Sequence, residues 1–380
     1  MDSLKFFISF LFKLNFSIPI KKKVLLYDNV SLNMLNGIIK ENKYNILKIR
    51  GETFNFFVIL SLIFNKITIT RNNYIKQYIK TVCPILVITS NEHDIFFYKL
   101  KNYFPNVKFI MVQNGNRSKN FDLLDNFKKN NKQKLLVDYY FLYNKHLASV
   151  YKKYLKFKPI ISGSFLNNSS PINTKLRKKN NILFLSQYSD KEVFNSKVYY
   201  SSDKKSEFWV ERQILPVLEY FCNKYKFNLY ILFRGSNDNF IKEKKFYKSI
   251  IKNFIPIKNK RFKNRLYSYQ ILDKFSKVVF VDTTLGYEAM LRNIKTVSIC
   301  CRKVKNKYLS NFTWPLKTRS KEGKFYLDKL NKKKMFKVLK SNFLEKNDKW
   351  YEKNKKIITS LISYDQGNKK LKKTIKDILN

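Results

Sequence analysis

The sequence predicts an α/β protein made of two doubly wound, parallel-sheet domains, and three observations lead to this prediction. The chain has 380 residues, which is too long for one ordinary domain and sufficient for two. Short apolar runs alternate with longer amphipathic ones, as expected of buried parallel strands covered by helices on both faces. A polar, basic stretch at Asn167–Asn181 interrupts this alternation and is typical of an inter-domain linker.

The first half repeats the strand–helix pattern from the apolar run KVLLY up to the linker. Uninterrupted apolar runs predict strands buried on both faces. The strands predicted here are Lys23–Tyr27, Tyr44–Ile49, Ile67–Thr70, Pro84–Thr89, Lys108–Gln113, Val137–Leu142 and Pro159–Ser162. Amphipathic stretches and one uncharged, buried stretch predict helices. These helices are Asn29–Lys40, Thr53–Asn65, Asn73–Lys80, Asp94–Tyr103 and Lys145–Tyr154.

The second half restarts the same pattern with the run ILFL. Its predicted strands are Ile182–Leu185, Leu229–Phe233, Val278–Val281 and Thr296–Cys300. Its predicted helices are Glu207–Tyr225, Ser268–Phe275 and Gly286–Arg292. From Asn331 onward the chain is helical, basic and amphipathic. We therefore expect a first domain over residues 1–170, a second over 171–330 and a basic helical segment over 331–380.

The chain carries a large positive charge, with 77 Lys plus Arg against 27 Asp plus Glu and a formal net charge of +50. Such a charge usually indicates nucleic acid or an anionic membrane as the partner. Lysine is spread along the whole chain, however, and the abundance of Lys, Asn, Ile, Phe and Tyr is that of an AT-rich genome. Two interpretations stay open: coding bias, or weak attraction to anionic lipid headgroups or phosphorylated substrates. No nucleic-acid partner is expected.

The amino terminus and the cysteines both indicate a cytoplasmic location. Met1–Ile20 is hydrophobic but contains Lys5 and Lys13 and lacks a small-residue cleavage site, so it does not fit a signal peptide. The longest uncharged run, Thr53–Asn65, is shorter than the roughly 20 residues that span a bilayer. The first segment can instead lie on a membrane surface. We expect a cytoplasmic protein with possible peripheral contact at the anionic inner face of the cytoplasmic membrane.

The four cysteines form no CxxC pair and only two histidines accompany them, so no metal site and no cofactor are predicted. Cys83 and Cys300 lie in apolar, strand-like runs, and we expect both to be buried free thiols. Motifs of P-loop enzymes, dinucleotide-binding proteins, metalloproteases and serine hydrolases are absent from the sequence.

The strongest candidate site is the strand–turn–helix that begins at Asp282. The turn amides and the helix N-terminus make an anion pocket, to which Thr283 and Thr284 can add hydroxyl donors. Gly286 lies in the same turn, and the Glu288 carboxylate can accept from two sugar hydroxyls. The alternative is an ordinary helix cap, in which a threonine caps the helix and Glu288 makes a capping contact.

Polar residues follow the other predicted strands, at the edge of a parallel sheet where ligands gather. After Lys108–Gln113, the turn at Gly115 permits a positive φ, and Gln113, Asn114 and Arg117 can face a cleft. After Pro84–Thr89 come Glu92, His93 and Asp94, which are general-base candidates or charges that complement a helix dipole. Asp28 and Glu52 occupy similar strand ends. In the second half, Arg234 suits a pyrophosphate, Gln187 and Tyr188 can frame a base or ribose, and Arg302 follows Thr296–Cys300. Each of these is also compatible with an ordinary turn.

Five stretches, in this order and spacing, resemble bacterial surface carbohydrate biosynthesis proteins of O-antigen and capsule loci. They are YIKQYIKTVCPILVITS at Tyr74–Ser90, FIMVQNGNR at Phe109–Arg117, ISGSFLNN at Ile161–Asn168, ILFLSQY at Ile182–Tyr188 and VDTTLGYEAMLRNIKTVSI at Val281–Ile299. The last resembles the donor-site strand–turn–helix of many GT-B glycosyltransferases. One departure is the sequence Asn91-Glu92-His93-Asp94, where an acidic–Asn pair is expected of the family.

The resemblance implies a GT-B fold, in which two Rossmann-like domains face each other across a cleft. It implies a nucleotide-sugar donor in the second domain and a glycan or lipid-linked glycan acceptor in the first. By this resemblance Thr283, Thr284 and Gly286 meet the donor phosphate and Glu288 the ribose. The predicted function is metal-independent sugar transfer to a surface polysaccharide precursor, with Glu92 or Asp94 as base and His93 as the backup. The alternatives are a nucleotide-sugar epimerase, a non-catalytic scaffold, or a basic nucleic-acid-binding protein.

Overall fold

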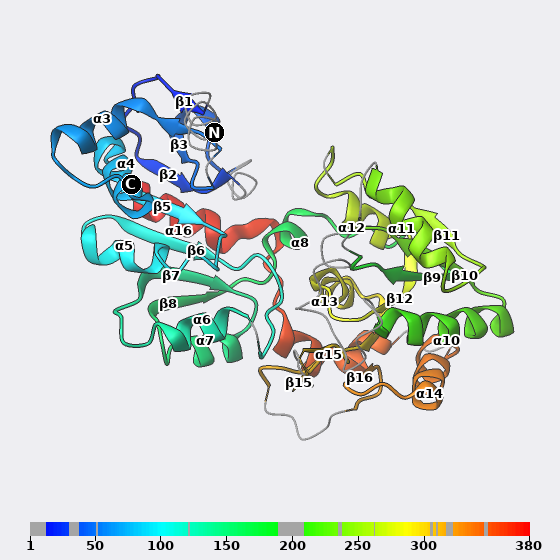
Figure 1. The fold of residues 1–380 in the computed structure, drawn as a ribbon. Coiled ribbons are helices and arrows are strands. Elements are labelled where there is room, and N and C mark those ends of the chain that lie inside the picture. Colours follow the sequence, from blue (N-terminus) through cyan, green and yellow to red (C-terminus); the bar gives the residue numbers. More distant parts are fainter. Residues whose placement is uncertain are drawn as a thin grey trace. The chain divides into compact units, whose positions relative to one another are not determined.

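The protein divides into two compact units, each built on one six-stranded sheet (Figure 1). The computed structural model describes residues 13–29, 38–50, 52–120, 122–188, 209–234, 238–261, 263–304, 307–308, 311–316, 322–345 and 349–380. The first unit comprises Met1–Asn114, Asn126–Phe165 and Asn368–Asn380, and the second comprises Gly115–Asp125 and Leu166–Gly367. The predicted pair of parallel-sheet α/β domains is confirmed.

The first unit contains a parallel sheet with the strand order β3-β2-β5-β6-β7-β8. Its strands are β2 (Val24–Tyr27), β3 (Tyr44–Leu47), β5 (Leu86–Thr89), β6 (Lys108–Val112), β7 (Leu136–Leu142) and β8 (Lys156–Ile161). Short β1 (Leu14–Asn15) pairs with β4 (Phe54–Asn55) apart from this sheet. The chain thus places β3 on one side of β2 and every later strand on the other, which creates a topological switch point between β2 and β5.

The helices of the first unit are mostly where the sequence predicts them. They are α3 (Phe56–Phe64), α4 (Arg71–Val82), α5 (Phe97–Tyr103), α7 (Lys145–Tyr151) and α16 (Lys369–Leu379), with a 3-10 turn at Glu41–Lys43; the unit division falls within α6 (Leu123–Lys129). The strand predicted at Ile67–Thr70 is wrong: this stretch leads into α4, where the Thr70 hydroxyl caps Asn73 N at 3.2 Å. Most of the helix predicted at Asn29–Lys40 falls on residues 30–37, outside the described residues.

The second unit has the strand order β11-β10-β9-β12-β13-β16, with all neighbours parallel. Its strands are β9 (Lys178–Leu185), β10 (Asn228–Leu232), β11 (Ile255–Ile257), β12 (Phe275–Phe280), β13 (Lys295–Ile299) and β16 (Tyr326–Leu327), besides the antiparallel pair β14 (Lys303–Val304) and β15 (Lys307–Tyr308). This is the strand order of the dinucleotide-binding Rossmann fold, with its switch point between β9 and β12.

Helices cover the second sheet and connect its strands (Figure 1). They are α8 (Phe165–Ser169), α10 (Trp209–Tyr225), α11 (Asp238–Lys248), α12 (Tyr267–Leu272), α13 (Thr284–Leu291), α14 (Lys332–Phe343) and α15 (Trp350–Leu361), with a 3-10 turn at Gln366–Asn368. One continuous core joins α10, α14 and the sheet through side chains such as Leu218, Phe221, Ile299 and Leu339.

The units differ from the predicted domain ranges in three places, the first being Gly115–Asp125, which belongs to the second unit. The stretch expected as a linker, Asn167–Asn181, contains the end of α8 and the start of β9. The expected basic segment 331–380 is divided, because α14 and α15 belong to the second unit and α16 to the first. The cysteine prediction is correct for buried Cys300 and wrong for Cys83, which is exposed at the left-handed C-cap of α4 with φ 50°.

A buried arginine, Arg292, ties together three segments of the second unit. Its side chain is 0 % exposed and makes a bidentate pair with Asp273, with Nε–Oδ1 at 2.9 Å and Nη2–Oδ2 at 2.6 Å. The same guanidinium donates to Asn167 Oδ1, Ser170 O and Pro171 O at 3.0, 3.3 and 2.8 Å. Because every hydrogen bond given above ends on a carboxylate or carbonyl-type oxygen, this pair holds the end of α13 against α12 and residues 167–171.

We expect Arg292→Met to destabilise the protein strongly, since it leaves the Asp273 carboxylate buried without its counter-ion. The expected loss is about 3–5 kcal/mol in the free energy of unfolding. Urea unfolding followed by circular dichroism measures it. The matched control is Lys334→Met, which removes an ion pair with Glu322 whose side chains are 53 % and 37 % exposed and should cost about 1 kcal/mol or less. Equal losses in the two variants would contradict this account of Arg292.

Candidate functional site

The switch point of the second sheet brings together two residues that the sequence analysis assigned to the donor site. Gln187 follows β9 and Asp282 follows β12, and Asp282 N donates to Gln187 Oε1 at 3.3 Å. Ligands of doubly wound sheets bind in the crevice outside the carboxyl ends of the strands, at this point of the topology. The predicted residues therefore lie at the place where the fold itself favours a ligand.

The Asp282 carboxylate is held by an arginine from the next strand end. Arg302, which follows β13, donates from Nε to Asp282 Oδ1 at 3.1 Å and pairs with buried Glu211 of α10. Burial alone would lower the pKa of Arg302, but the charges of Glu211 and Asp282 raise it above the ordinary value of arginine. The Asp282 side chain is thus held by Arg302, which Glu211 holds in turn, and this fixes the end of β12. The backbone of Asp282 leads into the turn before α13.

The turn after Asp282 does not form the ordinary helix cap that was the alternative to a phosphate site. Thr283 is the N-cap of α13, but its side chain makes no capping hydrogen bond. The Thr284 hydroxyl accepts from Asn116 N at 2.7 Å, so it binds a segment 168 residues away in the sequence. This second contact ties the segment Gly115–Asp125 to the start of α13, within the second unit.

Gly286 and Glu288, both predicted to meet the donor, are buried in α13. A Cβ on Gly286 would lie 2.2 Å from Cγ of Phe280, so glycine is needed here for close packing of the helix on β12. Glu288 is 3 % exposed. The groups of this turn that reach its surface at least in part are those of Asp282–Leu285.

Arg234 supplies a cation after β10, beside the Gln187 backbone. Its Nη1 donates to Gln187 O at 3.2 Å, and its backbone N donates to Glu243 Oε1 at 3.0 Å. Burial, and then the like charge of Arg234, lower the pKa of Arg261. The Arg234 guanidinium, held beside Gln187, suits a diphosphate. Gly235 and Ser236 lie outside the described residues.

The sequence analysis missed the group that fixes Arg234. Glu243 of α11 is 0 % exposed, and its Oε1 also accepts from the Ser186 hydroxyl, which in turn accepts from Tyr247 OH at 2.7 Å. Burial, and then Glu243, raise the Tyr247 pKa well above its usual value. Helix α11 itself was not predicted, so nothing in the sequence pointed to this carboxylate.

In the first unit, the strand-end residues at the β2–β5 switch point form a hydrogen-bonded set. Asp28, 0 % exposed and in a left-handed conformation with φ 90°, accepts from Arg50 Nε at 2.8 Å and from Asn91 Nδ2 at 3.0 Å. Exposed Glu52 accepts from Arg50 N at 2.9 Å. Arg50 thus links the strand-end residues Asp28 and Glu52, and Asn91 links Asp28 to the residues after β5.

Glu92 is held in a structural network, which argues against its predicted role as the base. Its carboxylate is 0 % exposed and accepts from Tyr140 OH and from Asn114 N, the latter at 2.9 Å. Burial, and then Glu92, raise the pKa of Tyr140 well above its usual value. A base must come within hydrogen-bond reach of the acceptor hydroxyl, and this carboxylate faces the protein interior.

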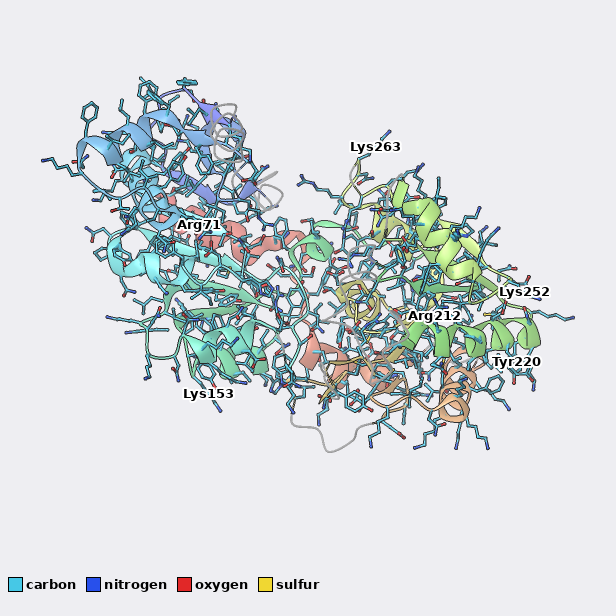
Figure 2. All side chains as sticks on the ribbon, in the orientation of Figure 1. Arg71, Lys153, Arg212, Tyr220, Lys252 and Lys263 are labelled. Atoms are coloured by element: carbon cyan, nitrogen blue, oxygen red, sulfur yellow. The ribbon has the colours of Figure 1, made fainter. Side chains whose placement is uncertain are left out.

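Asp94 is similarly engaged, whereas His93 is exposed. Asp94 Oδ2 accepts from Tyr27 OH at 2.8 Å and pairs with Arg71 at 2.5 Å, an arginine labelled in Figure 2. Burial, and then Asp94, raise the pKa of Tyr27 well above its usual value. His93 stands between these two carboxylates in the sequence and is the only one of the three base candidates classed as exposed. The structure thus favours the residue that the sequence analysis ranked third.

The division between the two units falls within the residues after β6, between Asn114 and Gly115. Gln113 is buried and accepts from Tyr143 N at 2.8 Å, and exposed Asn114 donates to Ser90 O at 2.8 Å. Arg117 belongs to the second unit, where it lies 3.8 Å from Asp122, although it was predicted on the acceptor side. Gly115 is not among the residues with positive φ; a Cβ there would lie 3.3 Å from Thr284 Oγ1, so close approach explains the glycine.

Asp328, at the carboxyl end of β16, is a second acidic group that the sequence analysis missed. It is 6 % exposed, its Oδ1 accepts from Phe312 N at 2.8 Å, and its Oδ2 is buried without a hydrogen-bond partner among the described residues. Burial raises the pKa of Asp328 to about 6. A lone acidic residue after a two-residue strand carries no sequence signal.

The Asp328 pKa predicts a change in stability with pH. The folded protein binds this proton more tightly than the unfolded chain, so the carboxyl stabilises the fold at low pH and this contribution is lost as pH rises through about 6. Asp328→Asn keeps the Oδ1 acceptor and removes the ionisation. Its melting temperature relative to the natural chain should therefore rise between about pH 4 and about pH 7.5. Exposed Glu352→Gln serves as the control, and a parallel rise there would refute the assignment.

No group of His, Cys, Asp or Glu side chains among the described residues has the arrangement of a metal site. In the same part of the chain, no helix has the length and apolar character needed to cross a bilayer.

The fold and the family are known from comparison. The solved structures described below show a GT-B fold for the two parallel-sheet α/β units, and residues 110–379 match the model of a family described as "putative O-antigen biosynthesis protein". The chain belongs to this family. No curated protein sequence matches it.

Solved structures support the fold. The chain is similar to S. aureus MnaA bound to UDP, with 13% identity, TM-score 0.53, and coverage of 95% of this chain and 96% of that one. The UDP-GlcNAc 2-epimerase of Methanocaldococcus jannaschii gives 12% identity, TM-score 0.52, and coverage of 95% and 99%. S. aureus TarM, solved with UDP, gives 13% identity and TM-score 0.47 over 82% of this chain. The chain spans only 59% of the length of TarM.

Proposed function

We propose that the protein is a glycosyltransferase that moves a sugar from a nucleotide-activated donor to a precursor of a surface polysaccharide such as O-antigen. The observation that carries the proposal is the contact of Gln187 with Asp282 N at the switch point of the second sheet, directly before α13. Membership in the O-antigen biosynthesis family supports the pathway class. UDP in the MnaA structure and UDP-GlcNAc with UDP in the M. jannaschii epimerase support a nucleotide-sugar as ligand of this fold.

In this scheme the second unit binds the donor diphosphate. The amides at the start of α13 and the Thr283 hydroxyl donate to phosphate oxygens, and Arg234 supplies positive charge. These groups stabilise the charge that develops on the leaving diphosphate, so the scheme needs no metal ion. Glu243 and Arg302 act as positioning residues, because they bind the backbone of Arg234 and the carboxylate of Asp282.

The first unit binds the acceptor, and His93 takes the proton of the attacking hydroxyl. This role follows from its exposure after β5, next to the switch point, whereas Glu92 and Asp94 are bound by tyrosine and arginine side chains. The acceptor is a glycan or lipid-linked glycan, and the protein works in the cytoplasm with peripheral contact at the anionic inner face of the membrane.

We expect Arg234→Ala to weaken binding of UDP about tenfold to hundredfold, because it removes a charge-assisted contact to the diphosphate. Isothermal titration calorimetry with UDP, CMP and GDP measures the effect and also identifies the preferred base. Lys248→Ala, at the far end of α11, removes one exposed positive charge and should bind like the natural chain. If no nucleotide binds the natural chain, the proposed donor site is wrong.

His93→Ala should lower the rate of nucleoside diphosphate release from the preferred nucleotide-sugar by about 10²–10⁴-fold, measured with a lipid extract of bacterial membranes as acceptor source. Nucleotide affinity should stay unchanged, because His93 belongs to the other unit. Glu352→Gln, a substitution of an exposed carboxylate on α15 outside the strand-end set, is the control. A His93→Ala chain with full activity would exclude this residue as the base.

A nucleotide-sugar 2-epimerase is the second candidate, favoured by the full-length correspondence with the M. jannaschii enzyme. Such an enzyme needs no acceptor. Incubation of the chain with UDP-GlcNAc alone, followed by proton NMR, distinguishes the two: an epimerised nucleotide-sugar without any acceptor would replace the transferase proposal.

A further inference from the structure

The first unit contains a basic groove at the opposite end of its sheet from the strand-end residues. It is a cavity of about 860 Å³ between the segment before β2, the residues before β3, and helix α16. Its lining residues are Lys21, Lys22, Lys23, Val24, Ile38, Ile39, Asn42, Lys43, Lys372, Ile375, Lys376, Leu379 and Asn380. Figure 1 shows α16, in red, packed on this unit, to which Asn368–Asn380 belong.

Six of these lining residues are lysines, and this concentration of positive charge indicates an anionic ligand. No salt bridge to any of them occurs among the described residues; the polar contact recorded is from Lys22 Nζ to Asn42 O at 2.5 Å. Lys153, Lys252 and Lys263, labelled in Figure 2, lie outside this group and point away from their units. Like charges that converge on one cavity repel one another, and a bound anion relieves this repulsion.

The groove also has an apolar wall. Val24 and Ile375 are buried, and Ile38, Ile39 and Leu379 are partly exposed at the cavity. Helix α16 explains this mixture: Leu371 and Ile375 face the unit, while lysines occupy the flanks. A site with lysines beside aliphatic side chains suits an anion that carries a hydrocarbon chain.

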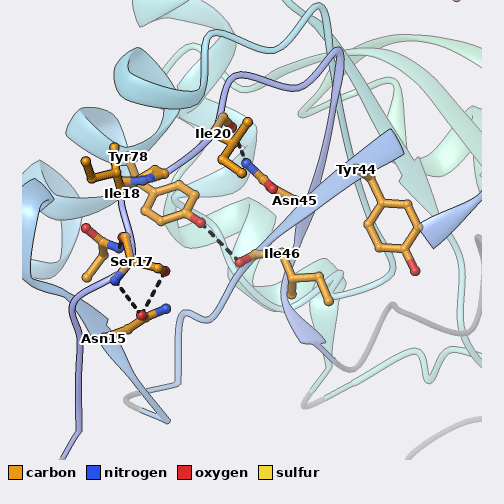
Figure 3. Close-up of a pocket in the computed structure, with 10 residues that line it drawn as sticks. Asn15, Ser17, Ile18, Ile20, Tyr44, Asn45, Ile46 and Tyr78 are labelled. Carbon is orange, nitrogen blue, oxygen red and sulfur yellow. Dashed lines mark hydrogen bonds between the residues drawn. The ribbon is translucent and has the colours of Figure 1, made fainter. Parts of the chain in front are cut away.

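Exposed apolar side chains adjoin the groove in the sequence. Phe16, Ile18 and Ile20, directly before Lys21, are 62 %, 69 % and 66 % exposed. Ile18 and Ile20 line a second cavity of about 460 Å³ together with Tyr44–Ile46, which directly follow Lys43 (Figure 3). The two cavities therefore lie along the same two chain segments. Apolar side chains next to lysines are the pattern by which proteins insert shallowly into anionic membranes.

The groove is separate from the proposed acceptor site. Lys23 and Val24 lie at the amino end of β2, whereas Asp28 follows its carboxyl end. A strand of this length separates its two ends by roughly 13 Å.

We propose that this groove binds the phosphate headgroup of an anionic phospholipid in a bilayer, while Ile18 and Ile20 insert among the acyl chains. The inference rests on the peripheral membrane contact proposed above and names its site. It places lysines of α16 and of the segment before β2 on the headgroup, and it gives a role to the amphipathic end of the chain.

The test measures sedimentation of the full chain with vesicles of phosphatidylcholine alone or mixed equally with phosphatidylglycerol. The double variant Lys372→Glu/Lys376→Glu should bind the anionic vesicles about tenfold or more weakly. The matched control is Lys333→Glu/Lys337→Glu on α14, which changes net charge equally at exposed positions of the second unit and should bind like the natural chain. Ile18→Ser/Ile20→Ser should weaken binding with no change of charge.

Each other outcome overturns the proposal in a distinguishable way. If both double variants bind anionic vesicles equally weakly, the attraction comes from the overall positive charge and not from a site in the groove. The groove is a site for free phosphate if two results occur together. Inorganic pyrophosphate raises the melting temperature of the natural chain but not of Lys372→Glu/Lys376→Glu, and the two chains bind vesicles equally. If the natural chain does not bind anionic vesicles, the proposed membrane contact itself is wrong. The affinity for UDP is measured in the same Lys372→Glu/Lys376→Glu variant. If it equals that of the natural chain, none of these results is due to failure of the donor site.

Discussion

The buried pair of Arg292 and Asp273 is the constraint on which the geometry of the second unit depends. Arg292 stands at the C-cap of α13, and its guanidinium binds α12 through Asp273 and the entering chain through Asn167, Ser170 and Pro171. The opposite end of α13 is the turn proposed to meet the donor. An anion site made of backbone amides is only as well placed as the helix that presents them. The pair therefore fixes, from a distance of one helix length, the direction in which those amides point.

Both sheets put their polar residues at a switch point, but they use them differently. In the first unit the carboxylates of Asp28, Glu92 and Asp94 accept from Arg50, Tyr140 and Arg71, so the network mainly holds the strand ends in place. In the second unit the buried carboxylates of Glu211 and Glu243 hold Arg302 and the backbone of Arg234. There the carboxylates hold two arginines near the start of α13, so cations and a helix N-terminus lie on the same side of the sheet. This division of roles agrees with a donor phosphate in the second unit and a neutral hydroxyl acceptor in the first.

Particular residues show how far the sequence alone leads. The strands and most helices could be predicted, because uncharged runs such as LVIT and VVF have no other stable place than a buried sheet. Strand order could not, since buried parallel strands look alike in sequence. Helix α11 was missed because its surface is rich in lysine, and with it Glu243. The engagement of Glu92 could not be foreseen, because its hydrogen-bond partner Tyr140 lies 48 residues later. Gly115 was explained by the wrong cause, since the close neighbour, Thr284, belongs to a distant segment.

The positive charge of the chain is the property that sequence and structure interpret differently. Because lysine is spread evenly along the sequence, the sequence alone indicates no particular basic surface and is compatible with coding bias. Folding changes this, because α16 returns from the far end of the chain to the first unit and brings Lys372 and Lys376 beside Lys21 and Lys43. Such convergence costs electrostatic free energy that a dispersed arrangement would avoid. Apolar side chains lie next to these lysines, and no acidic residue is among the described residues that line the groove. This is how a surface that binds anionic lipid differs from one that is merely basic.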